Sequence, residues 1–152
     1  MYARIQRDDK ALADFYHVVA LSPDNPIGHE WIGLVEYQQG YLNNARQQLS
    51  IGRALAPNDG QVARELGDVL ASQDDQLQAL ALYDQAIQLD PSNAQIYAAR
   101  AALLHHLGMA DPSIPDLRKV MVLTGDVQEH QWALRWLGNL IGTTSKVSSG
   151  TD

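Results

Sequence analysis

Prolines spaced 34 residues apart divide the middle of the chain into blocks of equal length: Pro23, Pro57 and Pro91. A proline restrains the residue before it to extended conformations, so each of these positions predicts the end of a helix. A period of about 20–50 residues is typical of repeat proteins, in which each unit packs only on its neighbours. The 152-residue chain is therefore expected to be an array of repeated units.

The composition is that of an acidic, helix-forming chain, rich in Ala, Leu and Gln. A formal net charge of −7 disfavours nucleic acids and anionic membranes as partners. The absence of cysteine excludes disulfides and thiolate metal sites. The N-terminus lacks the apolar core of a signal peptide, and no apolar run is long enough to span a bilayer, so we expect a cytoplasmic protein without membrane insertion.

Each full block predicts two amphipathic helices joined by a short turn. We expect full repeats at residues 26–59, 60–93 and 94–127, a partial repeat at 1–25 and a capping helix at 128–141. The partial repeat contributes a helix at 9–21, because residues 1–6 are too short for a stable helix of their own. Residues 142–152 are polar and small, which predicts a disordered tail.

Glycines mark the predicted turns inside the repeats. Gly40 and Gly108 are expected to end the first helices of their repeats, with Asp74 at the equivalent position between them. In the third repeat, Pro112 and Pro115 are expected in a turn or a first helical turn, where proline is tolerated.

In its 34-residue period and in the residues that end its helices, the chain resembles the tetratricopeptide repeat (TPR) family, whose unit is a 34-residue pair of antiparallel helices. Three columns carry the resemblance. The first is a small residue in the first helix of each repeat: Gly33, Gly67 and Ala101. The second is a small residue near the start of the second helix: Ala11, Ala45, Ala79 and Ser113. The third is a large residue four positions later: Phe15, Leu49, Tyr83 and Leu117. Small residues let two helices approach closely, and the large residue fills the space beside them.

The resemblance covers residues 1–127 and implies an all-α fold, a right-handed α-solenoid of TPR helix-turn-helix repeats within a domain at 1–141. Two departures are expected to weaken local packing: Gly52 stands where the family usually has Ala, and Arg100 where it usually has Leu.

No catalytic or metal-binding pattern is present in the sequence. There is no Gly-rich phosphate loop and no hydrolase or metalloprotease motif. His105 and His106 are adjacent, and neighbouring residues on a helix point about 100° apart, so they are expected to be two solvated side chains. We therefore expect a protein that is not an enzyme and that uses no metal or cofactor.

The resemblance further implies that the first helix of each repeat lines a concave groove that holds a peptide or a helix of another protein. The lining residues would be Ile27, Glu30, Trp31, Leu34 and Tyr37, then Gln61, Arg64, Glu65, Asp68 and Ala71, then Gln95, Ala98, Ala99, Ala102 and His105, with Trp132 and Trp136 on the last helix. Alternatively, Trp31 packs on the preceding helix, and Trp132 and Trp136 seal the last repeat. A carboxylate clamp is disfavoured, because Arg64 has Asp68 one turn away to neutralise it.

The N-terminal edge lacks the first helix of its own repeat. Ala11, Phe15 and Val18 would be left uncovered unless residues 1–5, a second copy of the chain or a preceding repeat of a longer protein covers them. The function predicted from the sequence is a non-enzymatic scaffold or adaptor. The alternatives are a structural unit that self-associates through this edge, giving a homo-oligomer, and a small acidic secretion-type chaperone for an apolar client segment.

Overall fold

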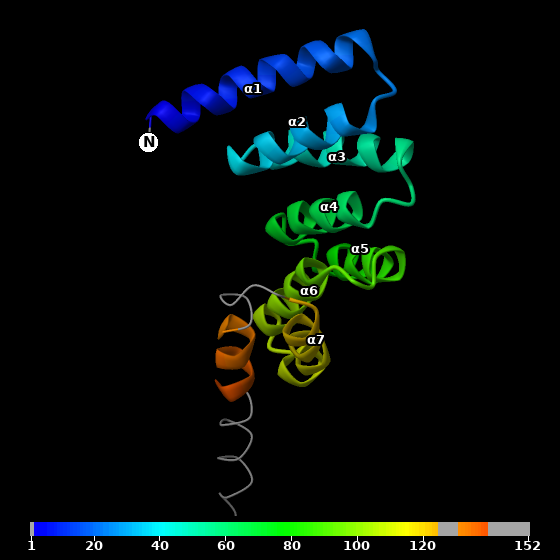
Figure 1. Ribbon diagram of the computed structural model, residues 1–152. Coiled ribbons are helices and arrows are strands. Elements are labelled where there is room, and N and C mark those ends of the chain that lie inside the picture. Colours follow the sequence, from blue (N-terminus) through cyan, green and yellow to red (C-terminus); the bar gives the residue numbers. More distant parts are fainter. Residues whose placement is uncertain (1, 125–130, 140–152) are drawn as a thin grey trace, which may run out of the picture. The chain divides into compact units, whose positions relative to one another are not determined.

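The computed structural model describes residues 2–124 and 131–139, with side-chain surroundings from residue 10 onward. These residues form eight helices, of which the last spans 131–139 and is unlabelled in Figure 1; the others are α1 (Tyr2–Leu21), α2 (Pro26–Gln38), α3 (Leu42–Leu55), α4 (Gly60–Ser72), α5 (Gln76–Leu89), α6 (Ala94–His106) and α7 (Ala110–Leu123). The predicted tail at 142–152 and the ends of the predicted capping helix, 128–130 and 140–141, lie outside the described residues.

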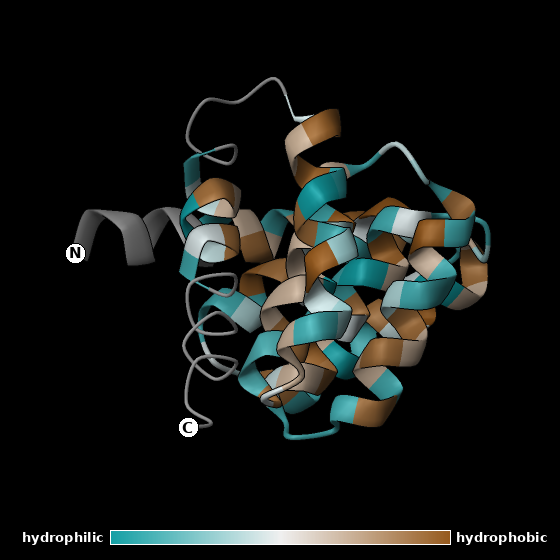
Figure 2. Ribbon diagram, turned by 90° about the horizontal axis from the view of Figure 1, so that it is seen from below, coloured by the Kyte–Doolittle hydropathy of each residue, from teal (hydrophilic) through white to brown (hydrophobic). Residues whose placement is uncertain are grey.

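The helices belong to two compact units, Met1–Asp90 and Pro91–Asp152. In the first unit α1 packs on α2, α2 pairs with α3, α3 packs on α4, and α4 pairs with α5 (Figure 1). In the second unit α6 pairs with α7, and the helix at 131–139 buries Ala133 and Leu137. Hydrophilic and hydrophobic residues alternate along the helices (Figure 2). The predicted all-α fold of paired helices is confirmed.

Each repeat boundary combines a helix stop with a helix start. The second helices end just before the periodic prolines, as predicted: α1 at Leu21, α3 at Leu55 and α5 at Leu89. Two residues after each proline, a side-chain oxygen accepts a backbone N–H of the next helix, over 3.0 Å for Asn25, 2.8 Å for Asp59 and 3.0 Å for Asn93. Such N-caps stabilise the start of a helix, so α2, α4 and α6 all begin at a defined residue.

The turns between paired helices use the left-handed backbone conformation that the sequence predicted. Gly40 has φ +84° and Gly108 has φ +73°, while Asp74 adopts φ +62° at the equivalent place. Asp is among the few residues other than glycine that enter this region, which explains how the second repeat keeps the same turn.

The columns of small and large residues meet as predicted. A Cβ atom on Gly33 would lie 2.6 Å from Leu49 Cγ, and one on Gly67 would lie 2.7 Å from Tyr83 Cε1. Leu49, Tyr83 and Leu117 are all buried. The absence of a side chain at Gly33 and Gly67 therefore sets how closely the paired helices approach.

Two helix starts differ from the prediction. α1 begins at Tyr2 rather than at residue 9, because extending an existing helix costs much less than nucleating a new one. α7 begins at Ala110, so Pro112 lies in its first turn while Pro115 lies inside the helix. Pro115 lacks the N–H that would bond to the carbonyl of Asp111, so the helix tolerates one missing hydrogen bond there.

The expectation that Arg100 weakens packing is wrong, because this side chain has a specific partner. Its Nε and Nη2 atoms donate to the two carboxylate oxygens of Asp116 over 2.8 and 2.6 Å. The Asp116 side chain is only 3% exposed and that of Arg100 is 25% exposed. A bidentate Arg–carboxylate pair of this kind links α6 to α7 in place of an apolar contact.

We predict that Arg100→Leu lowers the free energy of unfolding by about 2–4 kcal/mol, because it leaves the buried Asp116 carboxylate without a cation. Replacing both residues by leucine should restore most of the loss. Chemical denaturation followed by circular dichroism measures both effects, with the exposed Arg118→Leu on α7 as the control. Equal stability of Arg100→Leu and the control would contradict this role for the ion pair.

Candidate peptide-binding surface

Helices α2 and α4 of the first unit contact each other and carry a set of predicted residues that we call the α2–α4 surface. Its residues are those predicted from the sequence for the first two full repeats: Ile27, Glu30, Trp31, Leu34 and Tyr37 on α2, and Gln61, Arg64, Glu65, Asp68 and Ala71 on α4. The two helices are joined across this face by a 3.0 Å hydrogen bond between Tyr37 Oη and Ser72 Oγ. Glu30 of α2 lies close enough to Arg64 and Glu65 of α4 for their charges to interact, and of these predicted residues Glu65 is buried.

The α2 side of the surface is apolar and partly exposed. Ile27 is 60% exposed and Trp31 is 46% exposed. Because the two residues are four positions apart on one helix, they lie on the same face. Trp31 also stacks on Phe15 of α1, with ring centroids 5.8 Å apart and the planes within 7°. Trp31 therefore both packs on the preceding helix and presents apolar surface to solvent.

The same stacking covers part of the N-terminal edge. Phe15 and Ala11 are half-buried, and Tyr16 donates a 2.8 Å hydrogen bond to Glu36 Oε1 that ties α1 to α2. Val18 remains 39% exposed. Within the described residues, α2 thus covers part of this edge through the Phe15–Trp31 stack and the Tyr16–Glu36 hydrogen bond.

The α4 side is a hydrogen-bonded network around one guanidinium. Arg64 Nη1 contacts Asp68 Oδ2, so the predicted neutralisation of Arg64 is present, and Nη2 lies 3.4 Å from Glu65 Oε1. Gln61 donates to that same oxygen over 2.8 Å. Tyr83 of α5 donates to Asp68 Oδ1 over 2.7 Å. The sequence pattern indicated the contact within α4 but not the one from Tyr83, which lies 15 residues further along the chain.

Burial changes the acidity of the carboxyl groups on this surface. It raises the pKa of Glu65 to about 7, in spite of the hydrogen bond from Gln61 and the charge of Arg64. It also raises the pKa of Asp68, against the Arg64 charge, and that of Glu30, with the negative charge of Asp59 adding to the effect. The side chain of Glu65 is 3% exposed, and its Oε2 atom has no hydrogen-bond partner.

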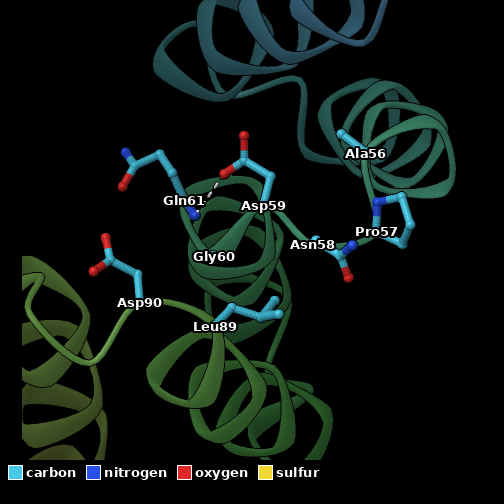
Figure 3. A pocket seen from close by; sticks show the side chains of 8 residues that line it. All are labelled: Ala56, Pro57, Asn58, Asp59, Gly60, Gln61, Leu89 and Asp90. Atoms are coloured by element: carbon cyan, nitrogen blue, oxygen red, sulfur yellow. Dashed lines mark hydrogen bonds between the residues drawn. The ribbon is translucent and has the colours of Figure 1, made fainter.

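An open pocket of about 490 Å³ lies where α4 begins and α5 ends (Figure 3). Its lining includes Asp59, Gln61, Leu89 and Asp90. The dashed line in Figure 3 is the capping bond in which the Gln61 backbone N–H donates to Asp59 Oδ1. Asp59 and Asp90 give the pocket two carboxyl groups, and Gln61 belongs both to the pocket lining and to the α2–α4 surface.

The predicted residues of the third repeat and the last helix lie in the second unit. Ala98 is half-buried, Ala102 and His105 are exposed, and the ring of Trp136 lies 4.5 Å from that of His105, measured between centroids. The ring centroids of Trp132 and Trp136 are 4.8 Å apart, and both side chains are half-buried. Trp136 thus lies between His105 of α6 and Trp132 of its own helix.

Two classes of site have no support in the part of the chain that the structure describes. No three His, Asp or Glu side chains there are grouped as metal ligands would be. Nor does any described helix combine the length and apolar character needed to cross a bilayer.

We predict that Glu65→Gln raises the free energy of unfolding at about pH 8 by about 1–3 kcal/mol. The usual pKa of 4.5 rises to about 7 on folding, so between these values the folded state keeps a proton that the unfolded state has lost. Stability therefore falls as the pH rises through this window, and glutamine removes that loss. Urea denaturation between about pH 5 and 8 measures the difference, which should shrink towards the acid end. A difference independent of pH would contradict the prediction, and exposed Asp14→Asn is the control.

Comparisons with known proteins agree with this architecture. A family model described as a TPR repeat matches residues 67–108. A crystal structure of MamA superposes with a TM-score of 0.73 at 17% sequence identity, covering 96% of this chain and 94% of that one. No curated protein sequence matches the chain.

At this identity the structural likeness bears on the fold alone, while the repeat model reports on the sequence. TPR domains commonly mediate protein–protein interactions, and the fold is typically non-catalytic. The period, the paired helices and the matching repeat model agree: residues 67–108 form a tetratricopeptide repeat, and the chain has a TPR-like fold of paired helices.

Proposed function

We propose that the chain is a non-enzymatic scaffold that binds a peptide or a helix of another protein on the α2–α4 surface. The observation that supports this most strongly is the exposure of Ile27 and Trp31 side by side on α2. Large aromatic side chains dominate the energetics of many protein interfaces. Because Phe15 already holds the Trp31 ring in place, little side-chain freedom is lost when a partner covers it.

We expect the charged residues of α4, Arg64, Glu65 and Asp68, to determine the register of a bound segment in addition to its affinity. Arg64 is bonded to Asp68 and Glu65, so its guanidinium is held in place, and it lies near enough to Glu30 of α2 to lower the pKa of that carboxyl group. Fixed charges beside an apolar anchor favour one register of a bound segment over others. The second unit offers His105, Trp132 and Trp136 as a further candidate contact.

We predict that Trp31→Ala weakens binding of a partner peptide by about 1–3 kcal/mol, as is typical of aromatic anchors, and that Tyr37→Ala has an effect of similar size. Peptides selected from a displayed random library on the wild-type chain serve as ligands, and isothermal titration calorimetry measures their affinity. Tyr41→Ala is the matched control, since this exposed tyrosine precedes α3 outside the surface. Unchanged affinity together with lost thermal stability would assign Trp31 to the core instead.

A self-associating assembly unit is the second candidate, supported by the exposed side chains of Tyr16, Val18 and Leu21 on α1. A chain that stays monomeric in light scattering at high micromolar concentration would exclude it. A chaperone for an apolar client segment would use the same Ile27–Trp31 patch. Enrichment of uninterrupted apolar peptides in the library selection would distinguish it from a general scaffold.

A further inference from the structure

We infer that the α2–α4 surface selects a partner segment in which a lysine or arginine side chain stands beside a large apolar side chain. This inference rests on the proposed function and adds the chemistry of the partner. It follows from the charges on the surface, the groups to which they are already bonded, and the position of the apolar patch.

Carboxylates outnumber cations on this surface. Glu30, Glu65 and Asp68 share it with Arg64. Among the described residues, Arg64 is the one cation that acts on the pKa values of all three carboxyl groups. Asp59 adds a further negative charge near Glu30. Because Glu65 is buried and keeps its proton up to its raised pKa of about 7, the negative charge that meets solvent comes from Glu30, Asp68 and Asp59, which outnumber Arg64 and complement a cationic group.

Arg64 is not available to an anionic ligand. Its Nη1 atom contacts Asp68, its Nη2 atom lies 3.4 Å from Glu65, and its Nε atom donates to Gln61 Oε1 over 3.4 Å. An acidic peptide would have to break these contacts and would add a negative charge to a site that already has several. A carboxylate ligand is therefore disfavoured on this surface.

Glu65 supplies an acceptor that the protein itself leaves unused. Its Oε1 atom accepts from Gln61 and Arg64, whereas its Oε2 atom is buried without a partner. A buried acceptor with no donor is unfavourable, but Oε2 is shielded from solvent, so the carboxylate that a partner's cation meets is the half-buried Glu30. The charge of Glu30 raises the pKa of Glu65, which indicates that the two carboxyl groups are close to each other.

The apolar patch lies within one helical turn of this acceptor pair. Ile27 and Trp31 are three residues before and one residue after Glu30 on α2. Side chains one turn apart on a helix are separated by about 5–6 Å. In an extended peptide, alternate residues are about 6.6 Å apart on one face. A bound strand can therefore place a basic residue at Glu30 and an apolar residue on Ile27, one helical turn away, when the two are separated by one position.

The exposed face of Trp31 strengthens this assignment. Lysine and arginine have long aliphatic stems that pack on apolar surface while the charged end reaches a polar partner. Either cation is also attracted to the face of a tryptophan ring. Trp31 and Glu30 together therefore suit a basic side chain better than a metal ion, for which the described residues offer no cluster of ligands.

The test uses three pools of short, end-blocked fluorescent peptides with randomised Ser and Ala at the other positions. The first fixes Lys and Leu at alternate positions, the second fixes Glu and Leu, and the third fixes Lys and Gly. Fluorescence anisotropy at low salt should show the first pool binding about tenfold more tightly than the second. Glu30→Gln and Glu65→Gln should each reduce this preference about threefold, while Asp14→Asn on α1 leaves it unchanged. Circular dichroism confirms that each variant is folded.

The outcomes separate this inference from the function on which it rests. Equal binding of the Lys–Leu and Glu–Leu pools, with both lost in Trp31→Ala, would overturn the charge selection and leave the scaffold function in place. Preference for the Glu–Leu pool would overturn it as well. Binding of no pool, combined with library peptides that are insensitive to Trp31→Ala, would overturn both proposals.

Discussion

The close approach of the two helices within each repeat is the constraint on which the other features depend. Gly33 and Gly67 have no room for a side chain, because Leu49 and Tyr83 occupy the space where a Cβ atom would lie. This contact determines which face of each helix is buried. In the first unit α2 packs on α1, α3 and α4, and Ile27 and Trp31 are the large apolar side chains of α2 that remain exposed. Packing thus decides which residues of the candidate surface reach solvent and which, like Glu65, are buried.

Charged groups are used differently in the two units. In the second unit Arg100 and Asp116 satisfy each other almost completely, so the pair is structural. In the first unit a single guanidinium serves several acceptors, and one oxygen of Glu65 remains without a donor. Buried charge is costly unless it is paired. A network that leaves a buried oxygen without a donor is therefore a candidate ligand site. A pair in which both charged groups are hydrogen-bonded is expected to stabilise the fold.

Much of the fold could be predicted from sequence because repeat architecture depends on local signals. The prolines marked helix ends, Gly40 and Gly108 marked turns, and Asp74 kept the same turn. One available signal was overlooked, the capping column of Asn25, Asp59 and Asn93, which follows the same period. Helix starts were harder to predict, as at Tyr2 and Ala110, because the cost of adding a residue to a helix is small and neighbouring packing outweighs it.

Local spacing along the chain thus determined the all-α fold, the repeat boundaries, the turn positions and the residue columns that meet inside each pair. It also indicated the contact between Arg64 and Asp68, since residues four apart on a helix face each other. Only the tertiary structure decided that Glu65 is buried, that Trp31 stacks on Phe15 and that Arg100 binds Asp116. The burial of Glu65 depends on residues far away in sequence, and each of the two contacts joins different helices. Burial and pairing across helices are set by the packing of whole elements, which periodicity within one helix does not encode.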